Sequence, residues 1–333
     1  MKMTPTQAKV LSSVCLQVDR AIPEIARECK LRPHVARYAL HELARSEHVR
    51  AFPIVNVHAL GYTDYCVFLT LTSENRASRQ KVLKFFADSP RTAWVAELSG
   101  EYHYTVSIFA RDIFEVDAYF RALAEVAPGV VVEKSLAIRI SWTTFRWKYL
   151  SNHRSTLDYI TRARSETIER LEEIDHTVLR AISEHPLAPR THQARAAGMP
   201  VTTFHHRVKG LQARGILLGT VYFVDTARMG IHTFRLLIQA KISTEKLTRL
   251  LWDFAHKHPN IVGFVHCFGA WDYELNVETL DPAVLATIHD NIEDLAGSQI
   301  RSIRAVSVLG TPKTKAYPFA EGGSHETLSR GGF

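Results

Sequence analysis

The chain has 333 residues, of which 46% are hydrophobic, so it is long enough for two or more domains with their own cores. Its 41 Lys and Arg against 34 Asp and Glu give a formal net charge of +7, which favours an anionic partner. The first residues contain no apolar segment of the secretory type, and the longest apolar run, residues 216–224, is far shorter than the roughly 20 residues that a membrane helix needs. These features predict a cytoplasmic protein without membrane segments.

The cysteines and histidines form no recognisable metal site. Cys15, Cys29, Cys66 and Cys267 include no Cys-x-x-Cys pair, and each lies in an apolar segment. We therefore expect four reduced cysteines that act as small core residues, and neither a metal nor a cofactor.

An internal repeat divides the sequence into two units. Residues of the first half reappear in the second at an offset of 168 or 169, with one insertion and one deletion over about 130 residues. The clearest matches are Gly61 with Gly230, Pro90 with Pro259, and Gly100 with Gly269.

Each unit begins with a pattern of three helices. In the first unit Thr4 and Pro5 are typical of a helix start, a short helix is expected near residues 23–30, and a third begins near Pro33. Apolar residues of the third helix are spaced i, i+4, i+7, and the second unit repeats this spacing. The apolar segments that follow, residues 49–57 and 216–224, can form a two-stranded wing, so a winged helix-turn-helix is predicted.

The exposed face of each third helix carries hydrogen-bond donors and cations, the types that reach bases and phosphates in a major groove. Residues 185–224 contain no Asp or Glu, which favours the second unit as the stronger binder. The residues expected to contact DNA are Arg32, His34, Arg37, Tyr38, His41, Arg45, Arg190, Thr202, Thr203, His205, His206, Arg207, Lys209 and Arg214.

The second part of each unit predicts a βαββαβ domain. Strands are expected at residues 65–71, 92–99, 102–110 and 130–140 of the first unit, with helices at 79–87 and 113–126. The second unit repeats them at 233–240, 261–268, 272–278 and 300–308, with helices at 245–256 and 281–295. Both helices lie on one face of such a sheet, so the other face, to which we assign Phe68, Val95 and Val106, needs a second sheet to cover it.

These expectations define the fold class as α+β, with two tandem units, each a winged helix-turn-helix followed by a ferredoxin-like βαββαβ sensor domain. Between the units, charged residues with apolar residues at near-helical spacing predict a connecting helix. The expected domains are winged helix-turn-helix 1 (1–58), sensor domain 1 (59–148), a linker helix (149–171), winged helix-turn-helix 2 (172–226), sensor domain 2 (227–317) and a disordered tail (318–333).

The chain resembles two fused members of the Lrp/AsnC (leucine-responsive/asparagine-sensing) transcriptional regulators. The resemblance is carried by residues 31–43 and 199–211, by residues 59–62, and by the hairpins at Gly100 and Gly269. It implies a non-enzymatic, nucleoid-associated regulator that binds duplex DNA, takes an amino acid or related effector at its sensor domains, and forms homo-oligomers through them.

The family's hairpin commonly reads Gly-Asp-x-Asp-Tyr, and the second unit is the closer match to it. By this resemblance the effector-binding residues are Gly100, Glu101, His103, Tyr104, Gly269, Asp272 and Tyr273. A carboxylate there could hold a ligand amine, while the alternative is that these residues only shape a turn.

Two other interpretations remain open. The siroheme decarboxylases resemble the same regulators, but they show an Arg-Glu-His segment followed by Asn-x-Trp, where this chain has residues 99–104 and 268–273 without that motif. Alternatively, a helix-turn-helix could serve only as an assembly surface in a sensor that does not bind DNA.

Overall fold

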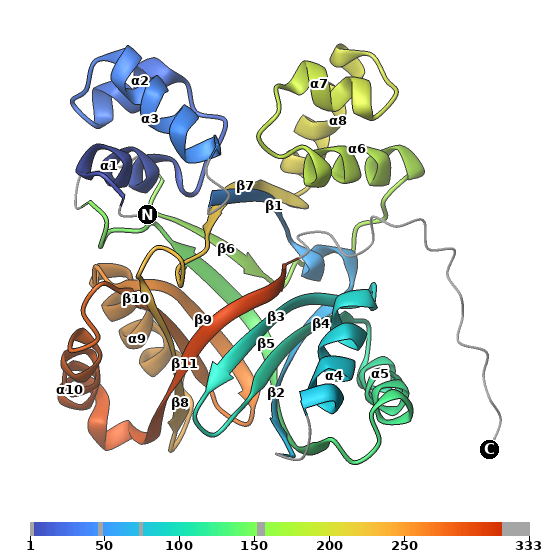
Figure 1. Cartoon of the computed structure of the whole chain (residues 1–333), viewed down its shortest axis with the longest axis vertical. Helices are drawn as coiled ribbons and strands as arrows, with labels where there is room; N and C mark the ends of the chain where they lie inside the picture. Colours follow the sequence, from blue (N-terminus) through green and yellow to red (C-terminus); the bar gives the residue numbers. More distant parts are fainter. Residues whose placement is uncertain (1–2, 46–48, 73–75, 152–156, 315–333) are drawn as a thin grey trace.

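The computed structural model describes residues 3–45, 49–72, 76–151 and 157–314. Two helical heads lie on one side of a large β-structure, as Figure 1 shows. The first head contains α1 (Pro5–Val14), α2 (Ile22–Glu28) and α3 (Pro33–Arg45), and the second contains α6 (Glu173–Glu184), α7 (Arg190–Ala196) and α8 (Val201–Ala213). The expected helix start is confirmed, because Thr4 and Gln7 form a reciprocal capping box at the beginning of α1.

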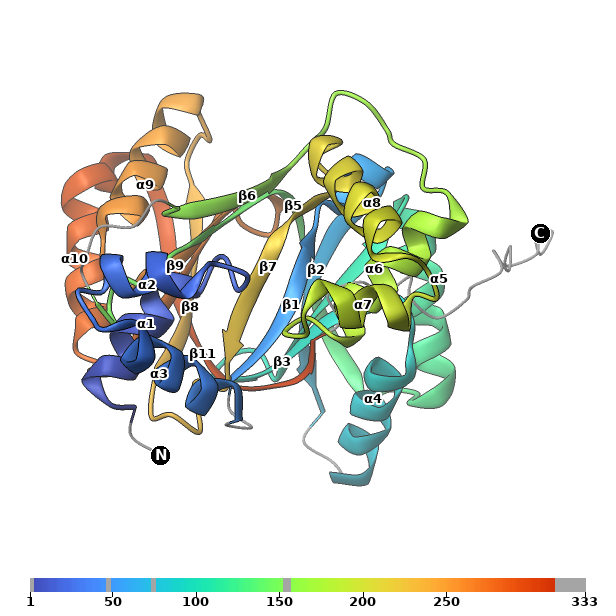
Figure 2. The same cartoon turned by 90° about the horizontal axis from the view of Figure 1, so that it is seen from above.

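The wing is shared between the two heads. β1 (Val49–Val55) follows α3, β7 (Leu217–Val224) follows α8, and the two strands pair antiparallel from Val49↔Val224 to Val55↔Leu217. Each unit supplies one strand, so the two-stranded wing forms between the units and lies between the heads (Figure 2).

Each sensor domain has the predicted βαββαβ order. The first contains β2 (Thr63–Leu71), α4 (Arg76–Asp88), β3 (Thr92–Ser99), β4 (Tyr104–Ala110), α5 (Ile113–Val126) and β5 (Val131–Phe145), after the short η1 (Val57–Leu60). The second contains β8 (His232–Ala240), α9 (Glu245–Lys257), β9 (Ile261–Gly269), β10 (Tyr273–Thr279), α10 (Val284–Ala296), η2 (Gly297–Gln299) and β11 (Ile300–Thr314).

The two sensor sheets join into a closed barrel. The strand order is β2-β4-β3-β11-β8-β10-β9-β5-β6, and β2 also pairs with β5, so every strand of this sheet except β6 (Tyr159–Ala163) belongs to a ring. β3 pairs with β11 at one junction and β5 with β9 at the other. The helices of both domains cover the outside (Figures 1 and 2), so each sheet buries its second face against the other domain.

The alternation of side chains corrects one prediction about these faces. Phe68 lies inside the barrel with Cys66, Leu237 and Val265. Val95 and Val106 instead belong to the core under α4 and α5. Because successive strand residues point to opposite faces, an apolar residue on each side of such a strand cannot be assigned from its type alone.

The predicted linker helix is wrong. Residues 159–163 form β6, which pairs with β5 from Ser141↔Ala163 to Phe145↔Tyr159. The free edge of the long β5 offers this segment the backbone hydrogen bonds of a sheet, whereas a highly charged helix without tertiary packing is only marginally stable. The predicted tail at 318–333 lies outside the described residues.

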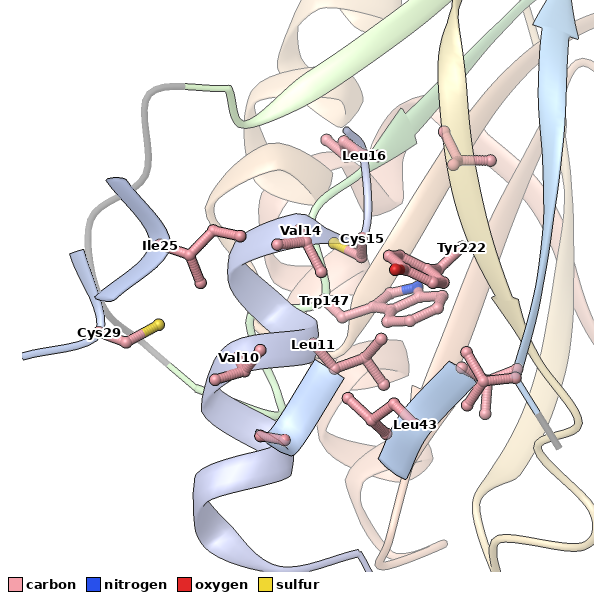
Figure 3. Close-up of a cluster of buried hydrophobic side chains, with 14 of the residues drawn as sticks. Val10, Leu11, Val14, Cys15, Leu16, Ile25, Cys29, Leu43, Trp147 and Tyr222 are labelled. Carbon is pink, nitrogen blue, oxygen red and sulfur yellow. The ribbon is translucent and has the colours of Figure 1, made fainter. Parts of the chain in front are cut away.

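The first head is tied to the barrel through the segment that follows β5. Trp147 packs among α1 residues and Tyr222 of β7, as Figure 3 shows. Ser12 Oγ donates a hydrogen bond to the Trp147 carbonyl (2.9 Å), and Arg146 Nη1 donates one to Ser12 Oγ (3.0 Å).

The helices of the described residues include none with the length and apolar character that a membrane span requires.

Candidate functional site

Charged and aromatic side chains gather inside the barrel at the end that faces the heads. β2 and β8 begin at this end, since each follows a wing strand closely in the sequence. We define the arginine–tryptophan cluster as Trp94 of β3, Arg139 and Trp142 of β5, Arg162 of β6 and Arg235 of β8. The opposite end of the interior is apolar, with Phe68, Leu98 and Trp271.

The guanidinium groups of the cluster stack against the two indoles. Arg139 lies 4.5 Å and Arg162 4.9 Å from the Trp142 ring centre. Arg235 lies 5.1 Å from the centre of Trp94 and 5.6 Å from that of Trp142. These distances are within the range of cation–π attraction. The two tryptophans and Arg162 are only partly buried, so the cluster borders solvent.

The acidic residues next to the cluster form ion pairs with Arg139. Its Nη2 lies 3.0 Å from Glu274 Oε2, and its Nη1 lies 3.6 Å from Asp64 Oδ2. Glu274 also accepts a hydrogen bond from Trp271 Nε1, and Asp64 accepts one from Ser107. Among the ion pairs of the described residues, none includes Arg162 or Arg235; Arg235 Nη1 donates to the neutral Asn276 carbonyl oxygen.

Two arginines of the cluster keep unsatisfied donors. The Nε atoms of Arg139 and Arg235 and the Nη1 of Arg139 are buried and have no hydrogen-bond partner among the described residues. Burial lowers the pKa of Arg235 to about 10, and burial also lowers the pKa of Arg162. A buried cation with free N–H groups is costly, and an anionic ligand would relieve that cost.

Three further polar groups lie around this end of the barrel. Glu278 of β10 accepts a hydrogen bond from the Tyr149 hydroxyl (2.6 Å), and burial raises the pKa of its carboxyl. His58 of η1 interacts electrostatically with Asp64 and Arg162, and burial lowers its pKa. The cluster thus combines cations, flat aromatic faces and groups able to carry a proton.

The cluster is not repeated in the two units. At an offset of 169, Trp94 corresponds to Gly263 and Arg235 to Cys66; at the later offset of 168, Trp142 corresponds to Gly310. Glu278 corresponds to Phe109. The barrel therefore holds one composite polar site, built from different residues of each unit.

The residues expected to contact DNA from the first head are all exposed. Arg32 precedes α3, and the others lie along its outer face: His34, Arg37, Tyr38, His41 and Arg45. Tyr38 has 67% of its surface exposed, so its ring and hydroxyl are accessible from solvent. Their role in binding stays a prediction.

In the second head, several of the expected contact residues are engaged inside the protein. Thr202, Thr203, His205, His206 and Lys209 are exposed on α8. Arg207 pairs with Glu172 (2.8 Å), Arg214 with Glu169 (2.8 Å) and Asp175 (3.1 Å), and Arg190 with Asp19 (3.4 Å). Three arginines of the acid-free segment are thus paired with carboxylates that lie outside it in sequence, which weakens the expectation that this head dominates.

The hairpin residues expected to bind an effector make local interactions. Glu101 pairs with Arg304 of the other unit (3.1 Å), and Asp272 accepts a hydrogen bond from the Ala240 amide (2.8 Å). His103 accepts one from the Leu71 amide, while Tyr104 and Tyr273 are buried. Gly100 and Gly269 have positive φ angles, and a Cβ at Gly269 would lie 2.5 Å from the Leu136 carbonyl oxygen. These contacts favour the turn-shaping alternative.

Sequence reasoning missed the cluster. Its only sequence signal is an arginine inside an apolar strand, as in residues 136–140 and 234–238. Such a charge requires a partner in the folded protein, but the sequence does not say which strands supply it.

Some known proteins match only one unit of this chain, whereas others match nearly the whole chain. No protein-family model matches. The HTH-type transcriptional regulator FL11 of Pyrococcus horikoshii is 23% identical over 143 residues, covering 43% of this chain and 92% of FL11. An AsnC family transcriptional regulator from Agrobacterium tumefaciens covers 44% of this chain and 94% of its own, with 18% identity and a TM-score of 0.38. The match to FL11 makes the chain similar to such a regulator over part of its length.

The solved structure of the siroheme decarboxylase NirDL matches both units together. It covers 94% of this chain and 96% of its own length, with a TM-score of 0.59 and 12% identity. Its complex with an iron-uroporphyrin III analogue gives the same TM-score at 13% identity. This match contradicts the expectation of a chain without enzymatic activity, because a protein with the same fold over nearly its whole length is an enzyme.

Proposed function

We propose that the chain binds a tetrapyrrole with carboxylate side chains at the arginine–tryptophan cluster and removes a carboxylate from it as CO₂. The observation that carries the proposal is the set of buried guanidinium N–H groups without hydrogen-bond partners among the described residues, held against two tryptophan faces at the solvent-bordering end of the barrel. The likeness to NirDL over the whole chain supports it at the level of the fold.

The chemistry of the cluster fits such a substrate. Guanidinium groups bind carboxylates through paired, charge-assisted hydrogen bonds, and indole rings stack against flat macrocycles. Arg162 and Arg235 can bind substrate carboxylates, because no carboxylate of the described residues forms an ion pair with them. Arg139 is already paired with Glu274, and its charge contributes to the electrostatic potential of the site.

The decarboxylase motif discussed above is absent from both hairpins, so proton transfer must use other groups of this chain. Decarboxylation breaks the bond between a side-chain methylene and its carboxylate, leaves the electron pair on the methylene carbon and needs one proton there. His58 and Glu278, which lie beside the cluster, are the candidates for holding that proton.

The test is a titration of purified protein with siroheme, followed by anaerobic incubation and mass analysis of the pigment. We expect a shift of the Soret band on binding and a loss of mass that corresponds to CO₂. Arg162→Gln and Arg235→Gln should each weaken binding by about 10- to 100-fold, since a hydrogen bond to a charged group contributes about 1.5–3 kcal/mol.

Arg304→Gln is the matched control. Arg304 also stacks on a tryptophan, 5.9 Å from the Trp271 ring, but it pairs with Glu101 and lies outside the cluster. It should bind siroheme like the unaltered chain. Equal losses in all three variants, or no CO₂ from the unaltered chain, would rule out the proposal.

We infer duplex DNA binding as a second activity, carried by the heads. The exposed donors and cations along α3 favour it, as does the similarity to FL11 over one unit. We place any small ligand at the cluster, because the hairpin side chains are engaged locally.

Fluorescence anisotropy with random duplex DNA at low and high salt tests this activity. Arg37→Glu should weaken binding and reduce the salt dependence. Arg79→Glu, a change of the same charge on the outer helix α4 of the barrel, is the control. Affinity that does not respond to salt or to Arg37→Glu would contradict a DNA-binding role for the first head.

A further inference from the structure

Of the two candidates for holding the proton, the geometry favours the carboxyl group of Glu278 at the edge of the cluster. Glu274, Asn276 and Glu278 alternate along β10 and share the face that points into the barrel, whereas Tyr273, Leu275 and Val277 lie in the core under α9 and α10. Asn276 holds Arg235, and Glu278 lies two residues further, about 7 Å along the strand, towards the heads. The charge of Arg235 acts on the Glu278 carboxyl, so a substrate carboxylate bound by Arg235 would bring its adjoining methylene towards Glu278.

The position of Glu278 is fixed from both sides. Its Oε2 accepts a hydrogen bond from the Tyr149 hydroxyl at 2.6 Å, and its backbone carbonyl accepts one from Asn260 Nδ2 at 3.0 Å. Tyr149 belongs to the segment that ties the first head to the barrel and packs against that head's core.

We propose that Glu278 is the proton donor of the decarboxylation, with Tyr149 as its positioning residue; this rests on the proposed function. The bond between the methylene carbon and the carboxylate breaks, CO₂ leaves, and the electron pair stays on the carbon, where the macrocycle delocalises it. The proton of the Glu278 carboxyl then forms the new C–H bond of a methyl group, and Glu278 regains a proton from water. No oxidant or reductant is consumed.

The surroundings of Glu278 favour the protonated form of its carboxyl over a wider pH range than in water. Burial raises its pKa, while the hydrogen bond from Tyr149 and the charge of Arg235 act in the opposite direction. Cys15 at the end of α1 also interacts with Glu278; burial raises the pKa of its thiol to about 12, so it is uncharged. The protonated form exists below the pKa of Glu278 and is lost above it, so turnover should decline on the alkaline side.

The test compares binding and turnover in Glu278→Gln. We expect its Soret shift to match that of the unaltered chain within about twofold, and CO₂ release to fall at least about 100-fold, the usual contribution of general acid catalysis. Glu97→Gln, on the exposed side of β3, should change neither. If the unaltered chain releases no CO₂, the proposed function fails; if it does and Glu278→Gln releases CO₂ as fast, only the assignment of Glu278 fails.

Tyr149→Phe gives a second, independent result if Glu278→Gln does not fold. Loss of the hydroxyl removes an interaction that lowers the pKa of Glu278, so the alkaline decline should move to higher pH. A lower rate with an unmoved pH profile would give Tyr149 a merely structural role and overturn the pairing.

Discussion

At the scale of single residues, the cluster depends on a missing side chain. Gly263 of β9 lies opposite Asn276 of β10, and a Cβ at Gly263 would come within 2.5 Å of Asn276 Nδ2 and 3.2 Å of its Cγ. The glycine therefore leaves room for the amide that accepts a hydrogen bond from Arg235. In the first unit the corresponding position is Trp94. Equivalent positions of the two units therefore supply an indole ring in one unit and space for a neighbouring side chain in the other.

Gly263→Ala should therefore move Asn276 and release Arg235. We expect a loss of about 1–3 kcal/mol in the free energy of unfolding, measured with urea, together with weaker siroheme binding. Gly210→Ala in α8 is the control, because nothing lies within 4 Å of its Cβ position and alanine favours helices. If both variants unfold at the same urea concentration as the unaltered chain, the contact at Gly263 does not matter.

The four cysteines should be unreactive in the native state. All are buried, and burial raises the pKa of the Cys66 thiol to about 12 and that of Cys267 and Cys29 above the ordinary value. At about pH 8 these groups remain thiols, whereas the nucleophile is the thiolate. Iodoacetamide should label none of them before denaturation and all four after it, as counted by intact mass; rapid labelling of the native protein would contradict the described packing.

At the scale of elements, ion pairs between the buried carboxylate of Asp175 and two arginines connect helices of the second head. Asp175 of α6 is 1% exposed, lies 3.1 Å from Arg214 Nη1 and 3.5 Å from Arg207 Nη1, and caps the start of its own helix with Glu172. It thus links the start of α6 to the second half and the end of α8 through two partly exposed arginines.

Asp175→Asn should destabilise this head. The arginines are one-third exposed, so we expect a loss of about 1–3 kcal/mol in the free energy of unfolding, below that of a fully buried pair. Asp225→Asn removes an exposed pair with Arg228 and should change it by less than about 0.5 kcal/mol. Similar effects of the two changes in urea unfolding would exclude a special role for Asp175.

The elements themselves were largely predictable, and their partners were not. Periodicity places α5 and β3 at the residues expected from sequence, because this signal is local. The prediction of a helix in the connecting segment was wrong because its apolar residues have near-helical spacing: Leu157, Ile160, Ile168 and Leu171. In the folded protein, residues 159–163 pair with the edge of β5 and form β6. The cluster could not be predicted, since it forms only when barrel closure brings β3, β5, β6 and β8 together.

At the scale of the whole molecule, the two units share an architecture but not an interior. A two-fold symmetric assembly would present each site twice, with the same residues on both sides of the axis. Here the positions that match Trp94 and Trp142 are glycines, and the position that matches Arg235 is Cys66. The covalent connection allows each unit to supply different side chains, so the barrel can fit a ligand that is itself unsymmetrical.

Because the barrel has a single composite cluster, we expect each chain to bind one ligand. Titration of siroheme into the protein at a concentration well above the dissociation constant should reach its end point at one equivalent, followed by the Soret band and by native mass spectrometry. Trp142→Leu should abolish most of this signal, since it removes the ring that contacts all three arginines, whereas Arg304→Gln should keep the same end point. An end point at two equivalents would mean that each unit has its own site, because a single composite cluster has no second copy of its tryptophans to offer.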